Sequence, residues 1–175
     1  VPTGATLDVT NATVTGLPAG GITVADQWRL TTTFTGSVNP LSSNLERIDS
    51  SAQGTIGSAM TVSSGVFSFP STGIYLVQFD IDQYLNGDNR YTIAYILATT
   101  DNSTYNNIAQ KAMFIQQTQA DNTSSSFNLS SFVDVTDISN VKVKFQLLCI
   151  NGSTNIIGDS TQNRTYMTFI RLGAT

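Results

Sequence analysis

The sequence predicts an all-β protein built as an antiparallel two-sheet sandwich, a jelly roll. Short stretches in which apolar and polar residues alternate follow one another along most of the 175 residues, and such alternation is typical of strands with one buried face. Turn residues separate these stretches, which gives about eight strands in roughly 150 residues, as in sandwiches and jelly rolls. Apolar residues make up 40% of the chain, enough for a core between two sheets.

The chain divides at residue 26. Residues 1–26 contain four glycines, two prolines and few apolar residues, so they cannot bury enough surface alone to offset the entropy lost on ordering. They form either a flexible leader or strands intertwined in an oligomer, and we expect a short, extended N-terminal stalk. Residues 27–175 form the expected head.

The strands of the head follow one another closely. The first alternation places Trp28, Leu30 and Phe34 on one side, with Arg29 opposite. Further strands are expected at 74–85, 91–99, 126–135, 141–150 and 165–172. Asn86-Gly87 predicts a hairpin between the first two of these, because this dipeptide accepts the positive φ angles of a type I′ turn. The apolar spacing within 104–119 also allows a short helix, but the neighbouring strands favour a strand.

The charge composition excludes several classes of function. Charged residues make up 11% of the chain, against about 25% in ordinary globular proteins, and the net charge is −4. So few cations cannot form the phosphate contacts of nucleic-acid-binding proteins or hold the chain to an anionic membrane. No apolar run approaches the roughly 18 residues of a membrane span. We expect neither a nucleic-acid partner nor membrane insertion.

Two residue types are scarce enough to restrict the chemistry. The chain has no histidine and one cysteine, Cys149. A His-based triad, a His or thiolate-cluster metal site and an intrachain disulfide are therefore excluded. We expect no catalytic residues and no cofactor.

The expected location is the virion. The first residues lack the basic and apolar parts of a signal peptide. A surface rich in Ser, Thr and Asn and poor in charge is nevertheless common on proteins that work outside cells. A viral coat or fibre component, folded in the host cytoplasm and released by lysis, reconciles the two observations.

Residues 65–79 resemble the complement globular-head and tumour-necrosis-factor-like family. That family has a Phe, five residues, a Gly, one residue, a Tyr and then alternating aromatics. The residues that match this pattern are Phe67, Gly73, Tyr75 and Phe79. The resemblance implies a TNF-like ten-stranded jelly roll over about residues 27–172, and a homotrimer. Residues 158–173 resemble the last strand of such domains on virion proteins of tailed bacteriophages.

The strand at 74–85 also favours a trimer on physical grounds. Its odd-numbered residues from Tyr75 to Ile81 form an apolar face suited to the core. Ile74 and Leu76 lie on the opposite face, and a strand that is apolar on both faces at one end is usually covered on both sides. Ile74 and Leu76 are therefore the predicted trimer interface. The alternative is that a loop of the same chain covers Ile74 and Leu76.

Candidate ligand-binding residues are few. Tyr84 and Tyr105, near loops, are candidates for stacking on a host surface glycan. Asp80, Asp82 and Asp88 are calcium candidates, although the run lacks the spacing of an EF-hand loop. Asp80 and Asp82 also lie some 6–7 Å apart on one face, as glycosidase acid pairs do, but a solvated strand end explains them as well. We expect neither a metal site nor an enzyme.

These observations predict a structural virion protein of a tailed phage. The expected form is a trimeric jelly-roll appendage on the capsid surface, a decoration protein or head fibre, with an adhesive role as an option. Residues 1–26 would attach it to the major capsid protein or another virion protein. If the chain is complete, these residues extend about 90 Å at most, which is too short for a long shaft and favours the capsid surface. The alternative is the receptor- or glycan-binding tip of a tail fibre. A polysaccharide-cleaving tailspike and a soluble cytokine-type ligand are further, less favoured alternatives.

Overall fold

The computed structural model describes residues 21–175, which form two antiparallel sheets. The seven-stranded sheet contains, in order, β2 (Thr32–Thr35), β11 (Asn155–Asp159), β6 (Gly73–Leu85), β12 (Tyr166–Gly173), β1 (Ala25–Leu30) and β3 (Leu45–Arg47), with β9 (Thr123–Val135) also paired to β6. The five-stranded sheet contains β4 (Thr61–Ser63), β5 (Val66–Ser68), β10 (Lys142–Cys149), β7 (Asn89–Thr99) and β8 (Asn106–Ile115). The predicted all-β, two-sheet sandwich is confirmed.

The core lies between the two sheets and is built by the alternation of each strand. Along β6 the buried face carries the residues that the sequence assigns to the core, Tyr75, Val77, Phe79 and Ile81. Phe145 of β10 packs against Phe79 of β6, with ring centroids 4.9 Å apart. Phe67 of β5 packs against Phe169 of β12, at 5.1 Å. Aromatic side chains therefore join the two sheets at the centre of the sandwich.

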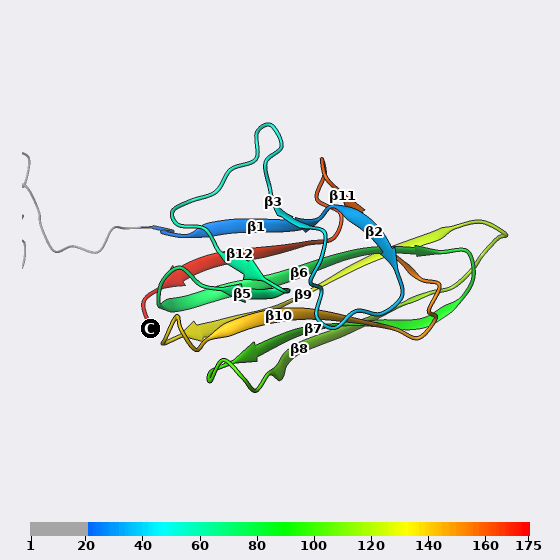
Figure 1. The fold of residues 1–175 in the computed structure, drawn as a ribbon. Helices are drawn as coiled ribbons and strands as arrows, with labels where there is room; N and C mark the ends of the chain where they lie inside the picture. The colour runs from blue at the N-terminus through cyan, green and yellow to red at the C-terminus, as the bar shows by residue number, and fades with distance from the viewer. Residues whose placement is uncertain (1–20) are drawn as a thin grey trace, which may run out of the picture.

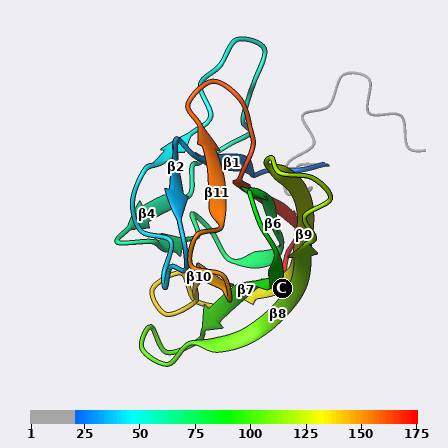
Figure 2. The same ribbon diagram turned by 90° about the vertical axis from the view of Figure 1, so that its right-hand side faces the viewer.

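The long strands give the molecule two distinct ends (Figure 1). Strand β1 begins and β12 ends at one end, and the β6–β7 and β8–β9 connections lie at the other. Strands β8 and β9 are edge strands of different sheets and lie side by side, as the view along the sandwich shows (Figure 2). Within residues 21–175 no helix is present that could cross a membrane.

Three expectations about the strands have different outcomes. Segment 104–119 contains β8 and no helix, as its neighbours indicate. The first alternation is divided at Thr31, whose backbone NH donates to the carbonyl of Asn44, so it forms β1 and β2. Strand β1 begins at Ala25, which pairs with Ile170, so the expected boundary after residue 26 falls inside this strand. Residues 1–20 of the expected stalk lie outside the described residues.

The predicted hairpin at Asn86-Gly87 is wrong. Strands β6 and β7 belong to different sheets, so the connection crosses the sandwich. Gly87 has a φ of 141° and Asn86 does not have a positive φ, whereas a type I′ turn needs two. Beyond the turn, the buried side chain of Asn89 donates to Thr92 Oγ1 at 2.8 Å and fixes the start of β7 in the second sheet.

Candidate functional site

The outer face of the seven-stranded sheet carries an apolar patch at the start of β6. Leu76 pairs across the sheet with Phe132 of β9 on one side and with Ile170 of β12 on the other. Directly opposite residues in antiparallel strands point to the same face, so all three share this face with Ile74. We refer to Ile74, Leu76, Phe132 and Ile170 as the apolar patch.

Residues 21–175 leave the apolar patch open. Ile74 and Leu76 are half-buried, and the side chain of Phe132 is 68% exposed. A phenyl ring that is two-thirds exposed beside Leu76 shows that no loop within residues 21–175 closes over this part of the face. The predicted pair Ile74 and Leu76 therefore lies on a free surface.

Phe132 and Ile170 are the members of the patch that the sequence analysis missed. The core residues of β9 are at odd positions, namely Phe127, Leu129, Val133 and Val135. Phe132 is thus an apolar residue on the otherwise polar face of its strand. Ile170 likewise lies on the face of β12 opposite the core residues Met167 and Phe169. That break in the pattern was visible in the sequence, but the pairing of both strands with β6 was not.

The second half of the same face is polar. Asp82 Oδ2 accepts a hydrogen bond from Arg164 Nε at 2.7 Å, and Asp80 Oδ2 accepts one from Gln78 Nε2 at 2.7 Å. Tyr166 pairs with Asp80 across the sheet. Partial burial raises the pKa of the Tyr166 hydroxyl, and the neighbouring Asp80 carboxylate adds to this effect. The Tyr166 hydroxyl therefore remains protonated at neutral pH.

The structure does not bring the calcium candidates into one site. The two carboxylates of β6 are already bound by Gln78 and Arg164, and Asp88 accepts the backbone NH of Gln117 at 2.6 Å. Among residues 21–175 there is no group of three or more His, Cys, Asp or Glu side chains able to hold a metal ion.

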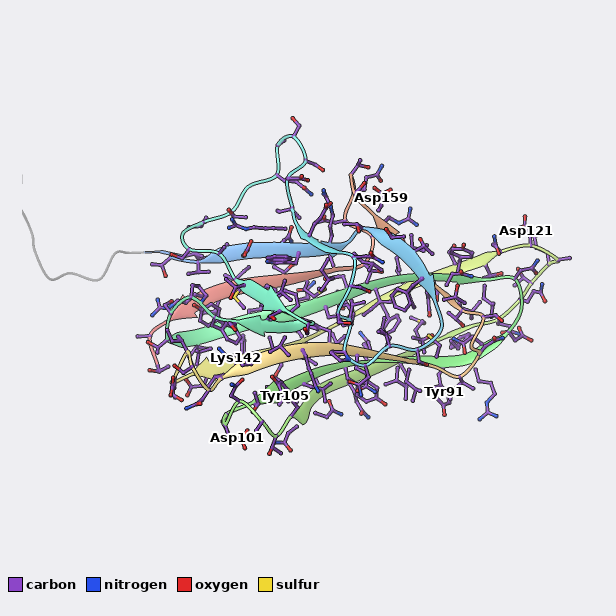
Figure 3. All side chains as sticks on the ribbon, in the orientation of Figure 1. Tyr91, Asp101, Tyr105, Asp121, Lys142 and Asp159 are labelled. Carbon is purple, nitrogen blue, oxygen red and sulfur yellow. The ribbon has the colours of Figure 1, made fainter. Side chains whose placement is uncertain are left out.

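The two candidate sugar-stacking tyrosines lie at opposite ends of the sandwich. Tyr84 is near the end of β6 and pairs with Ser124 at the start of β9. Tyr105 lies beside Asp101 in the β7–β8 connection (Figure 3). The ammonium group of Lys144 sits 4.2 Å from the centroid of the Tyr105 ring, so one face of that ring is already occupied. The two tyrosines do not form a common site.

A second apolar surface lies on the outside of the five-stranded sheet. Tyr91, Ile93, Tyr95 and Leu97 share one face of β7, which is its half-buried outer face. The core face of β7 carries Thr92, Ala94 and Ile96. Phe114 of the adjacent edge strand β8 is 59% exposed, and it provides a matched comparison for Phe132.

A pocket of about 470 Å³ opens over the polar half of the seven-stranded sheet. It lies between β6, β9 and β12, with β8 at its rim. The side chains and backbone that line it belong to Asp80, Ile81, Asp82, Lys111, Met113, Ser126, Phe127, Asn128, Arg164 and Tyr166. We refer to it as the polar pocket.

No family model and no curated protein sequence matches the chain. Solved structures do match its shape. The crystal structure of murine APRIL at pH 8.5 is similar with a TM-score of 0.59 and 8% identity, covering 85% of this chain and 98% of that one. Eiger TNF from S. frugiperda is similar with a TM-score of 0.59 and 15% identity, covering 87% and 94%.

The chain has a TNF-like jelly-roll fold. This confirms the fold that the resemblance of residues 65–79 implies. At such low identities the likeness concerns the fold alone. In this TNF-like jelly roll the apolar patch and the polar pocket occupy two halves of one sheet face.

Proposed function

We propose that the chain forms a homotrimer through the apolar patch on its seven-stranded sheet and is a non-enzymatic structural protein of a tailed-phage virion. The observation that carries the trimer is the exposed Phe132 ring beside Leu76 and Ile170. The resemblance of residues 65–79 to the tumour-necrosis-factor-like family also implies a homotrimer. Burying a phenyl side chain contributes roughly 2–3 kcal/mol, and threefold symmetry repeats each contact three times.

The proposed place of the trimer is the capsid surface, as a decoration protein or head fibre. Few charges, the surface rich in Ser, Thr and Asn, and the resemblance of residues 158–173 to phage virion proteins support this proposal. Residues 1–26 would contact the major capsid protein or another virion protein.

A non-enzymatic role is part of the same proposal. The chain has no histidine. The acid pair considered in the sequence, Asp80 and Asp82, is held by Gln78 and Arg164, so neither carboxylate is set apart as an acid or a base. Incubation with host envelope polysaccharide is expected to release no new reducing ends, and their release would contradict the proposal.

The second candidate function is the receptor- or glycan-binding tip of a tail fibre. The polar pocket favours it, because its mixture of charged, amide and hydroxyl groups suits a hydrophilic ligand. Fractionation of disrupted virions separates the two candidates. The chain is expected with emptied capsids, and its recovery with tails would favour the fibre tip.

The trimer is tested by light scattering on three proteins at micromolar concentration. The wild type is expected to have three times the mass of one 18.7 kDa chain. Phe132→Ser is expected to dissociate, because it removes the most exposed apolar group of the patch from all three copies. Phe114→Ser is the matched control on the other sheet and is expected to remain trimeric. A monomeric wild type, or dissociation by Phe114→Ser alone, would contradict the proposal.

A further inference from the structure

We propose that the polar pocket binds a sugar. The pocket has a volume of about 470 Å³, which lies within the usual range for small-molecule sites and accommodates one or two sugar rings. It is distinct from the two tyrosines singled out in the sequence, and its chemistry comes from three adjacent strands and a fourth at the rim. The proposal shares a glycan ligand with the second candidate function and does not depend on the trimer.

The carboxylates of the pocket retain acceptors for sugar hydroxyls. Gln78 and Arg164 bond to one oxygen of each carboxylate, Oδ2 of Asp80 and Oδ2 of Asp82. Each carboxylate oxygen has two lone pairs, so both residues keep acceptor capacity beside these bonds. The two residues are i and i+2 on one strand, so their side chains project from the same face about 6.6 Å apart. Each can accept from a different hydroxyl of the same ring.

The donors in the pocket are equally available. Lys111 of β8 makes no ion pair and Asn128 of β9 makes no side-chain hydrogen bond in the described part of the chain. Arg164 uses its Nε on Asp82, and its two terminal nitrogens have no hydrogen-bond partner among residues 21–175. Sugar hydroxyls donate and accept, so a site with carboxylates, an amide and cations can satisfy them in both directions.

The pocket also has a partly apolar wall. The half-buried ring of Tyr166 and the side chain of Met113 line it. The C–H face of a pyranose packs on such groups, while the Tyr166 hydroxyl lies beside the Asp80 carboxylate. An apolar wall next to polar groups distinguishes a sugar from a simple inorganic ion.

The charges of the pocket define the class of sugar. Asp80 and Asp82 are balanced by Lys111 and Arg164, so the formal charge of the lining is zero. Two carboxylates disfavour a phosphate group, which carries close to two negative charges at neutral pH. An uncharged hexopyranose is therefore the expected ligand, and a sugar with a single carboxylate is the closest alternative within the same class.

Saturation-transfer NMR on the full-length protein tests the site with methyl α-glucoside, methyl β-galactoside, N-acetylglucosamine and glucuronic acid at millimolar concentration. Asn128→Ala and Lys111→Met are expected to weaken the binding of the responding sugar by about tenfold, because each removes a direct donor. Lys142→Met removes a lysine of β10 that does not line the pocket, and it is expected to bind like the wild type. A response to glucuronic acid above the others would place the ligand among acidic sugars and support the site.

Mass and circular dichroism on the same samples separate loss of the site from loss of the fold or of the trimer. No response from any sugar in a folded wild type would overturn the proposal. Equal binding by wild type, Asn128→Ala and Lys111→Met would also overturn it, as would a response to inorganic phosphate in place of the sugars. The mass of the trimer is measured independently of sugar binding. The trimer proposal and the sugar-site proposal can therefore be contradicted separately.

Discussion

The buried carboxylate of Asp26 accepts a hydrogen bond from Arg47 Nε at 2.7 Å, which joins β1 to β3. The other carboxylate oxygen accepts the backbone NH of Met60 at 2.8 Å and the indole NH of Trp28 at 3.3 Å. The Asp26 side chain has no exposed surface. A single charged residue thus holds the first strand, the third strand and the segment that leads to β4.

We predict that Asp26→Ala destabilises the head by about 3 kcal/mol. The substitution leaves Arg47 without its partner and the NH of Met60 unsatisfied, and loss of one member of a buried ion pair costs roughly this much or more. Urea unfolding followed by tryptophan fluorescence measures the change. Asp121→Ala, in the exposed β8–β9 connection, is the control and is expected to change little. A loss below about 1 kcal/mol would show that Asp26 is dispensable.

The tight turn between β4 and β5 gives a second prediction. Gly65 has a φ of +79°, and a Cβ there would lie 2.5 Å from the backbone oxygen of Leu41. We expect Gly65→Ala to cost at least about 2 kcal/mol of unfolding free energy, because the turn and the neighbouring backbone would both shift. Gly54→Ala is the matched control, since nothing lies within 4 Å of its Cβ position. Equal effects of the two would contradict this reading.

Cys149 is predicted to react slowly with thiol reagents. Its side chain is buried on the inner face of β10, and burial raises the pKa of the thiol. Burial limits access of the reagent, and the raised pKa lowers the fraction of thiolate at pH 8. Iodoacetamide is expected to label the protein rapidly in denaturant and hardly at all in buffer, as measured by intact mass. Rapid labelling of the native protein would show that this end of β10 opens.

Asp101 is predicted to make the stability of the β7–β8 connection dependent on acid. Its Oδ1 accepts hydrogen bonds from the backbone NH groups of Thr104 at 2.7 Å and Ser103 at 2.9 Å, and from the Thr99 hydroxyl at 2.7 Å. These bonds hold the pKa of the carboxyl well below its usual range, with the bond from Thr104 contributing most.

The direction of the acid effect follows from that lowered pKa. The stabilisation is present above the ordinary aspartate pKa of about 4 and is lost as the pH falls through the lower pKa of the folded state. Asp101→Asn is therefore expected to be less stable than the wild type at pH 7, and the difference is expected to shrink below pH 4. Thermal melts at pH 7 and pH 3 measure it. A constant difference would contradict the assignment.

The strands were predictable from sequence wherever one face is buried, as the core face of β6 shows. The burial of charged residues was not predictable in this way. The sequence places Arg29 opposite the apolar face of its strand, yet Arg29 is fully buried and bonds to Glu46 and Asp49. Both partners lie in the stretch rich in Ser and Gly that follows β2. Local alternation carries no information about such distant partners, so it assigns a buried arginine to the surface.

The candidate site shows the same limit. Ile74 and Leu76 could be identified because one strand is apolar on both faces, a feature of a single segment. The polar pocket could not, because it combines Lys111, Asn128 and Arg164 from segments that meet only through the pairing of β6 with β9 and the packing of β8 on β9. The Asn86-Gly87 error has a related cause, since turn residues indicate a reversal and not which sheet the next strand joins.

Because β1 begins and β12 ends at the same end of the sandwich (Figure 1), the molecule is suited to accept a fused protein at one end and an inserted peptide at the other. A protein fused after Thr175 would lie beside the start of β1. A peptide inserted at Asp121, at the far end (Figure 3), would be presented a full strand length away from it. Antigen display and terminal tethering could therefore be engineered without interfering with each other.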